Sequence, residues 1–460
     1  MLLGMNDRPN RIPDAVPKAS SDPLPEISSF LKPFAPLFRR SQSRHSLERY
    51  VTGLLTDLDR KNCDTIAAAV AGTSTERLQH LLTDADWDSR QLDGARVRSL
   101  SEKSPEGGGI LVLDDTSFPK QGKSSVGVAR QYCGALGKRA NCQVVVSAQY
   151  VAGEPESSRP LHWPVSAQLY LPRGWANDAA GRRERAHAPE EVGFRSKPQI
   201  ALSLVDLSRE WEVPFETVVA DSGYGDNPNF LGGLEERKVA YVCGVESTFG
   251  VRRPEEVRAA KEAGAPLYKG RGQPPKERPA PLYTTKEVIE SLPEEAWQTV
   301  SWREGTKGTL SKQMVAVRAH RATGSPRHST THERVVTAEE GWLIAERPLG
   351  PSGKDLPGEE ELKYYYSSLG ADVSLERLAA LAKSRWAIEQ FYEDAKGECG
   401  LGDYQGRRWE GLHRHLALVM VAYSFLMLHS SVTGIGGSST TPSGEIFFPY
   451  GAAHDASGHP

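Results

Sequence analysis

The spacing of apolar residues divides the chain into a helical part, a strand-rich part and a helical end. Between about residues 27 and 100, apolar positions recur every three or four residues, as in amphipathic helices. After residues 107–109, all glycine, the period changes, and near-continuous apolar runs predict strands at 110–115, 142–151, 166–171, 216–221 and 239–245. Helical patterns at 198–211 and 227–237 lie between these strands. The alternation predicts an α/β fold whose mixed sheet is covered by helices on both faces.

Residues 251–345 interrupt this pattern. They are rich in proline and charge at first and become strand-like at 297–308 and 312–320, which indicates an insertion. One more strand is expected at 363–369, followed by a single long amphipathic helix from Leu375 to Lys396. The apolar stretch 416–428 is shorter than the roughly 20 residues that span a bilayer, so we expect a buried helix and no membrane segment.

Composition and charge describe a globular protein with local basic surfaces. The 460 residues are 38% hydrophobic and 25% charged, enough to bury a core, and the chain is too long for one small domain. The net charge of −3 excludes a uniformly basic coat protein or a polybasic membrane binder. Three segments are nonetheless clearly positive: 32–61, 116–143 and 251–280. This segregation allows a polyanion to bind locally.

The cysteines and histidines exclude several kinds of site. The five cysteines form no C-x-x-C pair, which argues against a disulfide framework and a zinc ribbon. The 12 histidines show no metal-ligand spacing. Residues 1–23 are interrupted by Asp, Arg and Pro and do not resemble a secretion signal. We therefore expect a protein of the reducing cytosol.

Two of the predicted strands end in aspartate. Asp114 and Asp115 close the strand at 110–115, and Asp221 closes the strand at 216–221. Catalytic groups in α/β sheets gather at the carboxyl ends of strands, so two of these side chains could meet. The alternative is that aspartates simply favour the turns that follow strands.

The late helix carries a second group of candidates. Arg385, Glu389 and Lys396 lie four and then seven residues apart, which puts them on one helical face. An ordinary solvated Arg–Glu pair has the same spacing. A helix carboxylate joined to two strand-end aspartates is, however, the set of hard oxygen ligands that two-metal phosphoryl chemistry requires.

The segment 116–143 is basic without a single acidic residue. It follows the first predicted strand, so a polyanion bound beside the aspartates would meet it. It imitates a phosphate-binding loop, but Ser117 stands where the first glycine of that motif is needed and Pro119 removes a backbone donor, so we reject nucleotide binding there. A solvated surface is the alternative. Its cations are Lys120, Lys123, Arg130, Lys138 and Arg139.

Together these motifs resemble a family, the bacterial insertion-sequence transposases of the DDE superfamily. The resemblance covers roughly residues 30–428. It rests on LDDTSFPKQGKSSVGVARQYCGALGKRANCQ, VVADSGYGDNP, WREGTKG and RWAIEQFYEDAKGECGLGDYQGRRW. The late helix is similar to the family's R-x₃-E-x₆-K signature, here Arg385, Glu389 and Lys396. The tyrosine often found three residues before the arginine is Ala382 in this chain.

The resemblance implies a fold and domain boundaries. The expected fold is α/β, an RNase H-like mixed sheet flanked by helices and interrupted by a β-rich insertion domain, with a helical N-terminal domain. That N-terminal domain, for DNA binding or assembly, spans 26–105, and flexible tails span 1–25 and 430–460. The catalytic core spans 106–250 and 346–429, and the insertion spans 251–345.

The resemblance also implies the site and its chemistry. Asp114, Asp221 and Glu389 form the catalytic triad and hold two Mg²⁺ ions, with Mn²⁺ as a substitute. Asp114 is preferred over Asp115 because the family pattern is Asp, a variable residue and Thr, and because strand alternation places Val112 with Asp114. A metal-activated water would cut the DNA to leave a 3′-OH, which would then attack a phosphodiester.

The implied partner is double-stranded DNA, both the terminal inverted repeats of the element and the target, bound by a homodimer. Arg385 and Lys396 would hold phosphates, and Trp302 would stack on a flipped base, although packing in the core is an alternative for this tryptophan. The implied location is the bacterial cytoplasm, at the nucleoid when active. Two other functions stay open: a catalytically idle DNA-binding regulator, and a metal-dependent nuclease of the same fold.

Overall fold

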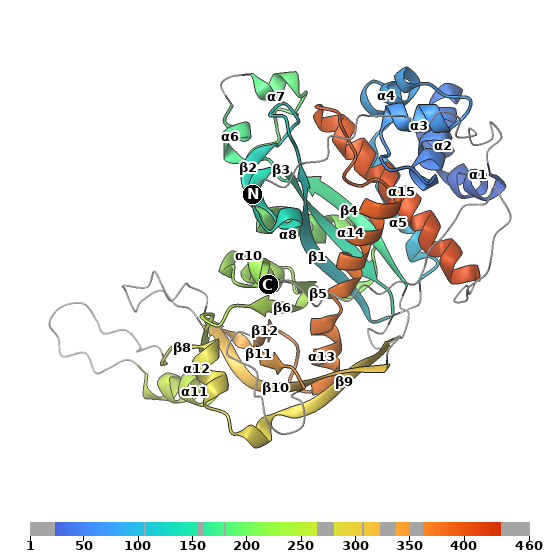
Figure 1. Ribbon diagram of the computed structural model, residues 1–460. Coiled ribbons are helices and arrows are strands. Elements are labelled where there is room, and N and C mark those ends of the chain that lie inside the picture. The colour runs from blue at the N-terminus through green and yellow to red at the C-terminus, as the bar shows by residue number, and fades with distance from the viewer. Residues whose placement is uncertain are drawn as a thin grey trace, which may run out of the picture.

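The computed structural model describes residues 24–104, 107–153, 161–178, 181–264, 280–305, 308–322, 337–349 and 362–433. Twelve strands in these segments form one mixed sheet, in the order β2-β3-β1-β5-β6-β12-β11-β10-β7-β8, with β4 paired to β3 and β9 paired to β10. Helices lie on both sides of it (Figure 1). The predicted α/β class with a large mixed sheet is therefore confirmed.

Five strands form the half of the sheet that carries the predicted aspartates. β1 pairs antiparallel with β3, and β3 pairs antiparallel with β4. On its other side β1 runs parallel to β5, which runs parallel to β6. Because β1 runs parallel to β5 with Leu113 opposite Ala220, Asp114 in the middle of β1 lies beside Asp221, which directly follows β5. The bounds are β1 Gly109–Pro119, β3 Lys138–Val151, β4 His162–Leu169, β5 Phe215–Ala220 and β6 Ala240–Val245.

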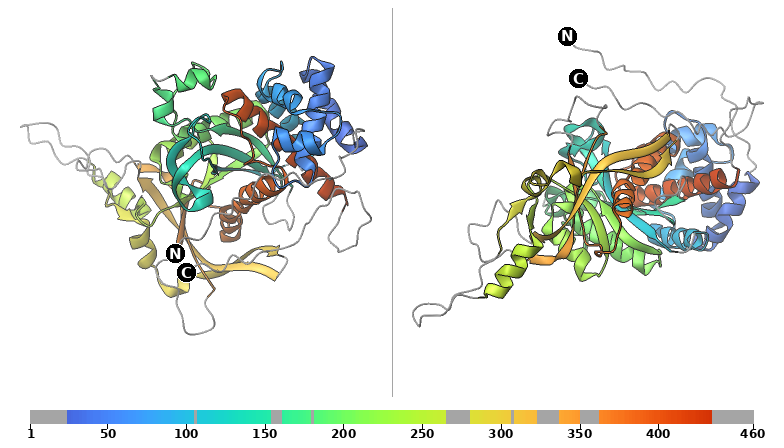
Figure 2. Two further views of the ribbon diagram at one scale, coloured as in Figure 1. Left: turned by 45° about the horizontal axis from the view of Figure 1, so that its top comes forward. Right: turned by 90° about the horizontal axis from the view of Figure 1, so that it is seen from below.

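The strands of the expected insertion continue the same sheet. β12 pairs antiparallel with β6, β11 with β12, and β10 with β11, so hydrogen bonds run without a break from the aspartates into this region. Figure 2 shows these strands extending from the core. The bounds are β7 Gly250–Arg252, α11 Pro254–Ala263, β8 Tyr283–Thr284, α12 Thr285–Glu290, β9 Gln298–Gly305, β10 Gly308–Ala322, β11 Thr337–Arg347 and β12 Lys363–Ser367. Residues 265–279, part of the predicted basic segment 251–280, lie outside the described residues.

Strand alternation sorts the core into two apolar clusters, one on each face. On β1, Val112 belongs to the cluster that contains α14 and α15, whereas Leu113 belongs to the cluster that contains α8 and α10. The sheet is thus buried on both sides, as its continuous apolar runs predicted. The helix bounds are α8 Lys197–Glu210, α10 Pro228–Glu236, α14 Trp386–Glu398 and α15 Trp409–Thr433.

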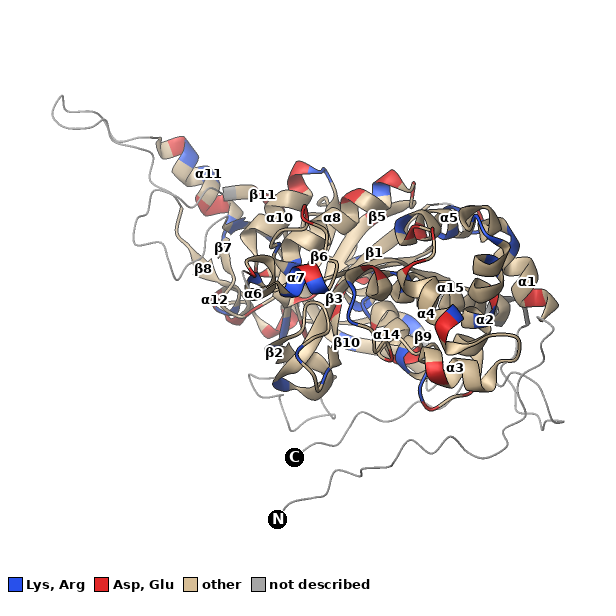
Figure 3. Cartoon of the chain, turned by 90° about the horizontal axis from the view of Figure 1, so that it is seen from above, with Lys and Arg blue, Asp and Glu red and all other residues tan. Residues whose placement is uncertain are grey.

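The N-terminal helices share their core with the sheet. They pack around α15 and belong to the apolar cluster on that face (Figure 2). Lys and Arg alternate with Asp and Glu over their outer surfaces (Figure 3). Their bounds are α1 Pro25–Leu31, α2 Ser41–Leu55, α3 Cys63–Ala69, α4 Thr75–Thr83 and α5 Ser89–Ser101. The predicted domain boundaries stay a prediction, and the predicted tails lie almost wholly outside the described residues.

The most apolar helix is an internal one. Residues 409–429 of α15 are long and apolar enough to cross a bilayer by length and composition, but 83% of the window is buried within the protein. Its side chains from Leu416 to Tyr423 are almost wholly shielded by the N-terminal helices and β4. Burial inside the protein is what the apolar stretch 416–428 predicted.

The predicted single helix from Leu375 to Lys396 is wrong, because it consists of two helices. α13 Leu375–Lys383 ends before α14 begins, and Arg385 is the residue that caps α14. The hydroxyl of Ser384 donates to the carbonyl of Leu381 at 2.7 Å. A serine hydroxyl bonded to its own helix competes with the backbone ladder, and here the chain turns at that point. The break aims Arg385 toward the sheet.

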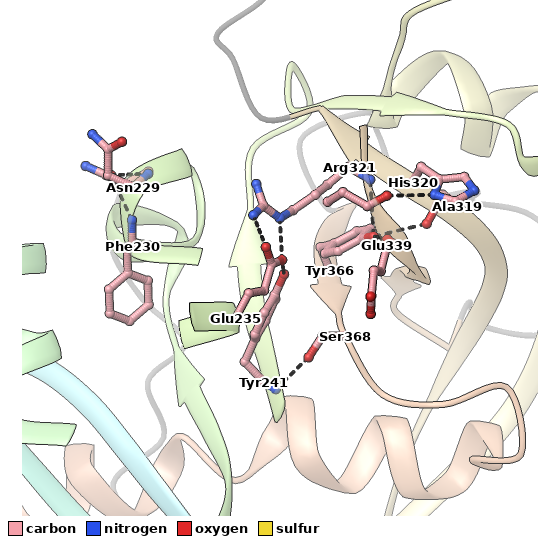
Figure 4. Close-up of polar contacts among 12 residues, drawn as sticks. Asn229, Phe230, Glu235, Tyr241, Ala319, His320, Arg321, Glu339, Tyr366 and Ser368 are labelled. Carbon is pink, nitrogen blue, oxygen red and sulfur yellow. Dashed lines mark hydrogen bonds and ion pairs between the residues drawn. The ribbon is translucent and has the colours of Figure 1, made fainter. Parts of the chain in front are cut away.

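A polar cluster fastens the extended half of the sheet to the helix α10 (Figure 4). The guanidinium of Arg321, on β10, donates two hydrogen bonds to Glu235, at 2.8 and 2.5 Å. Tyr241 donates to the same carboxylate at 2.8 Å. Because the Arg321 side chain is only 1% exposed, its charge depends on Glu235 for compensation.

We expect Glu235→Gln to lower the free energy of unfolding by about 2 kcal/mol, because it leaves the buried Arg321 charge unpaired. The expected loss of stability is smaller than for a fully buried ion pair, because the Glu235 carboxylate keeps some contact with water. Urea unfolding followed by circular dichroism measures it. Glu236→Gln, on the exposed neighbour, is the matched control and should change stability by less than about 0.5 kcal/mol. If Glu235→Gln and Glu236→Gln lowered the free energy of unfolding equally, Glu235 would not be the residue that compensates the Arg321 charge.

Candidate active site

Three segments far apart in the sequence meet where β5 ends beside the middle of β1. Asp114 lies on β1, Asp221 directly follows β5, and Glu389 lies in the first turn of α14. Arg385 joins the first and the third: its guanidinium bonds Asp114 at 2.5 Å and also pairs with Glu389. Arg385 and Glu389, which lie four residues apart, thus form an ion pair, and Arg385 also reaches the sheet at Asp114.

A close contact between backbones holds Asp221 in place. The residues after Asp221 form the short helix α9 Ser222–Gly225, which presses against β6. A Cβ atom added to Gly225 would lie 1.9 Å from the carbonyl oxygen of Gly244, so only glycine fits there. The glycines of the DSGYG sequence therefore fix where the chain leaves β5, and with it the position of Asp221.

Burial makes the negative charge at this edge costly. Burial raises the pKa of Asp114 to about 7, with Arg385 opposing the rise and the neighbouring Asp221 adding to it. Burial also raises the pKa of Asp221, again against the effect of Arg385. The carboxylates consequently need a positive charge beside them. In this structure the guanidinium of Arg385 provides one.

Asp115 belongs to a different environment. Lys197, on α8, donates to both of its carboxylate oxygens, at 2.8 and 3.0 Å, and Tyr224 donates to one of them at 3.3 Å. The alternation of β1 causes this separation, since Asp114 faces α14 and Asp115 faces α8. The predicted orientations of the two aspartates are confirmed, and Asp115 is already neutralised by a lysine.

The carboxylates fit a hard divalent cation in their chemistry but are not gathered around one position. Oδ1 of Asp221 is buried and has no hydrogen-bond partner, so an oxygen ligand is left open at the site. Within the described segments, no three His, Cys, Asp or Glu side chains lie close enough together to hold an ion. Arg385 occupies the place between Asp114 and Glu389. Carboxylate oxygens are nevertheless the ligands that Mg²⁺ prefers.

Lys396 lies on the same side of the sheet as Asp114. Burial lowers its pKa, and the nearby Cys133 and Asp114 oppose that change. Its ammonium lies 5.8 Å from the ring centre of Tyr392, whose hydroxyl hydrogen-bonds Ser147 at 2.6 Å. The signature residues Arg385, Glu389 and Lys396 are thus placed along one face of α14, close to Asp114.

A cleft of about 530 Å³ opens beside Asp221 and Arg385. It lies at the carboxyl ends of β5 and β6 and reaches β12, and Ala382 lines it where the family pattern often has a tyrosine. Its other polar residues come partly from the chain just after β5 and β6 and partly from α12 and β12. No local sequence pattern predicts the second group, because it reaches this edge only through long-range contacts. The residues are Ser222, Glu246 and Ser247 in the first group and Lys286, Lys363 and Tyr365 in the second.

The five cations of segment 116–143 fall into two kinds. Lys120 is half-buried, and its ammonium donates to the carbonyl of Tyr404 at 2.7 Å, so it fastens the chain after β1 to the loop before α15. Lys123 is exposed in the loop that follows. The other three are exposed on the hairpin formed by β3 and β2 Ala129–Cys133: Arg130, Lys138 and Arg139.

Trp302 lies on β9 and is half-buried against the apolar core. Lys383 of α13 lies 5.6 Å from the centre of its ring. Trp297, the other tryptophan of this segment, has Arg347 at 4.2 Å from its ring centre. Both rings thus have a protein cation beside them, and a contact of Trp302 with DNA stays a prediction.

Comparison with known families and proteins gives three findings. Residues 33–309 match the family described as DDE superfamily endonuclease, and residues 195–425 match the family described as Transposase DDE domain. The probable transposase for insertion sequence element IS701 from Microchaete diplosiphon is 28% identical over 232 residues, which cover 50% of this chain and 56% of that protein. The chain thus matches about half the length of this relative. The NurA nuclease from Sulfolobus solfataricus aligns over 75% of this chain and 92% of its own, but at 10% identity and a TM-score of 0.22 the likeness carries no argument.

The raised pKa of Asp114 predicts how stability depends on pH. An aspartate titrates near pH 4 in the unfolded chain and Asp114 near 7 in the folded one, so the folded state gains from its protonation. The contribution of protonated Asp114 to the free energy of unfolding is complete below about pH 4 and is lost as pH rises to about 7. We expect Asp114→Asn, which cannot ionise, to be more stable than the wild type by about 1–2 kcal/mol at about pH 8 and indistinguishable from it near pH 4. Urea unfolding at the two pH values, in EDTA, checks the difference, and an Asn variant less stable at pH 8 would contradict it.

Proposed function

Because the chain belongs to the insertion-sequence transposases of the DDE superfamily, we propose that it cuts DNA at the terminal inverted repeats of its own element and joins the released 3′ ends to a new site, in cut-and-paste transposition. One observation carries the proposal. Asp114, Asp221 and Glu389, which come from three distant segments, converge on Arg385 at one edge of the sheet.

The strand order supports an RNase H-like core. In the order β4-β3-β1-β5-β6, the first three strands pair antiparallel with one another, and β5 and β6 run parallel to β1. Helices cover both faces of these strands. We infer that residues 106–250 and 346–429 make up this core, with 251–345 as the inserted part and 26–105 as an N-terminal domain for DNA binding or assembly.

In this proposal Asp114, Asp221 and Glu389 hold two Mg²⁺ ions, or Mn²⁺ in their place. Bound ions would supply the activation of the attacking hydroxyl and the stabilisation of the leaving oxygen. The open oxygen of Asp221 and the cost of burying Asp114 as an anion support a cation there. The choice of Asp114 over Asp115 is supported by Lys197, which already neutralises Asp115.

The chain's own cations would position the DNA. Arg385 neutralises two carboxylates in the free protein, and its planar guanidinium also suits a phosphate, so we infer that it turns to the DNA when metal takes over the carboxylates. Lys396, close to Asp114, would hold a neighbouring phosphate. The exposed cations Lys123, Arg130, Lys138 and Arg139 would follow the backbone away from the cut, and Trp302 is retained as a candidate for stacking on a flipped base.

The proposed partners are the terminal repeats and target DNA, bound by a homodimer, in a bacterial cytoplasm and at the nucleoid when active. Two alternatives remain as outcomes of the tests. A regulator that binds DNA without cutting it is disfavoured because all three carboxylates are retained around a buried, charged site. A nuclease of the same fold would cut DNA but would not join the ends.

The two neighbouring aspartates give a sharp test of the site. We expect Asp114→Asn to lower the rate of cleavage of DNA that carries the sequences flanking the coding region by more than about 100-fold, because a ligand is lost. Asp115→Asn, the matched control, should lower it by less than about tenfold, since its partner is Lys197 and not the substrate. Gel assays of single turnovers measure both rates. Loss of activity only in the Asp115 variant would reverse the assignment, and cleavage without strand joining by the wild type would favour the nuclease.

Metal binding can be followed without activity. We expect Mg²⁺ or Mn²⁺ in millimolar excess over EDTA to raise the melting temperature of the wild type at about pH 8, because a ligand that binds only the folded state stabilises it. Glu389→Gln and Asp221→Asn should each reduce this shift. An equal shift in the wild type and in both variants would place the metal elsewhere.

A further inference from the structure

The hairpin β2–β3 presents an exposed aromatic ring at a basic tip. Tyr132 is 62% exposed and Leu136, at the turn, is 46% exposed. Of the five large apolar side chains that are exposed in the described part of the chain, these are two, and Tyr132 is the one aromatic. An exposed aromatic ring is available for stacking on a planar group of a ligand.

The outer face of the hairpin combines this ring with arginines. Arg130 and Tyr132 alternate outward, and Arg139 is the cross-strand partner of Tyr132. On the opposite face Cys133, Cys142 and Val144 are buried in one small apolar cluster, beside the half-buried Gln131 and the exposed Lys138. The outward side chains are therefore held on a surface that packs firmly behind them.

The positive charge of the hairpin is uncompensated. Its cations have no carboxylate partner among the described residues, and Arg139 makes only a hydrogen bond of 3.5 Å to the carbonyl of Arg130. Segment 116–143 contains no Asp or Glu. Figure 3 shows the basic positions along β2 and β3. A surface with an aromatic ring between free cations is typical of proteins that stack on bases and track a phosphate backbone.

The hairpin is also fixed relative to the candidate active site. The hydroxyl of Ser117 accepts the backbone N–H of Ala135 at 3.1 Å and lies 3.3 Å from the sulfur of Cys133. Ser117 follows Asp114 by three residues on β1, roughly 10 Å along the strand. Lys396 lies near both Cys133 and Asp114. A DNA strand held at Asp114 would therefore pass the base of the hairpin.

We propose that the β2–β3 hairpin reads the DNA next to the cut: Tyr132 stacks on an unpaired base, while Arg130 and Arg139 bind the phosphates on either side of it. This inference rests on the proposed function. The unpaired base is favoured over a groove of intact duplex because the ring is flanked by cations and stands on a flat strand face, which suits a base plane. Lys120 takes no part, because its ammonium is used by Tyr404.

Two fluorescent DNAs of the same mixed sequence test the inference: a fork with unpaired arms and a fully paired duplex, both with 2-aminopurine at the junction position. Binding is measured by anisotropy in EDTA, with the full-length protein. We expect Tyr132→Ala to weaken binding to the fork about tenfold and binding to the duplex less than twofold, and to abolish quenching of 2-aminopurine. Tyr132→Phe should bind the fork and the duplex as tightly as the wild type does and should still quench 2-aminopurine. Arg130→Ala should weaken binding to both DNAs and reduce the salt dependence by about one phosphate contact.

The controls separate this inference from the function on which it rests. Leu349→Ala removes another exposed apolar side chain, at 46% against 62% for Tyr132, from a different part of the surface and should change neither affinity nor quenching. Unfolding curves verify that each variant is folded. Wild-type affinity and quenching in Tyr132→Ala would overturn the hairpin's role and leave the cleavage tests of Asp114 untouched. A wild type that binds neither DNA would overturn the proposed function and the inference together.

Discussion

The site depends on the need to neutralise carboxylates that are buried at the edge of a sheet. Parallel pairing of β1 and β5 brings Asp114 and Asp221 to the same edge, where little water reaches them. In the free protein Arg385 offsets part of this charge and ties α14 to β1. The turn at Ser384 gives Arg385 its direction, so a local break in helical structure sets the electrostatics of the whole edge. The metal ions that we propose would have to take these oxygens from Arg385.

Several features followed from the sequence because they depend on local periodicity. The alternation of β1 separates Asp114 from Asp115 and gives them partners on opposite faces, α14 and α8. The run from Leu416 onward became a buried helix because it is apolar all round. The aspartates also led to the correct part of the sheet, although only Asp221 follows the end of its strand. The prediction that the first strand ends at Asp115 is wrong, because β1 continues to Pro119 through Thr116 and Ser117, which are buried but polar and so are not marked by an apolar run.

Other features were out of reach because they arise from contacts between distant segments. No local pattern shows that β12 pairs with β6 and so brings Lys363 and Tyr365 to the cleft. The break at Ser384 depends on one hydroxyl in a sequence without Pro or Gly. Lys120 looked like the other cations of its segment, and only the fold shows its bond to Tyr404. No local pattern predicted that β10 and β11 would continue the sheet through β12 instead of forming a separate one.

The position of strands β7 to β11 along the chain has a consequence for synthesis. Asp114 and Asp221 precede these strands and Glu389 follows them. A chain that is still on the ribosome therefore carries both aspartates before Arg385, which pairs with Asp114, has been made. The order of the elements along the chain keeps the site incomplete until nearly all of the protein has been made, and a product truncated within the insertion has no third carboxylate.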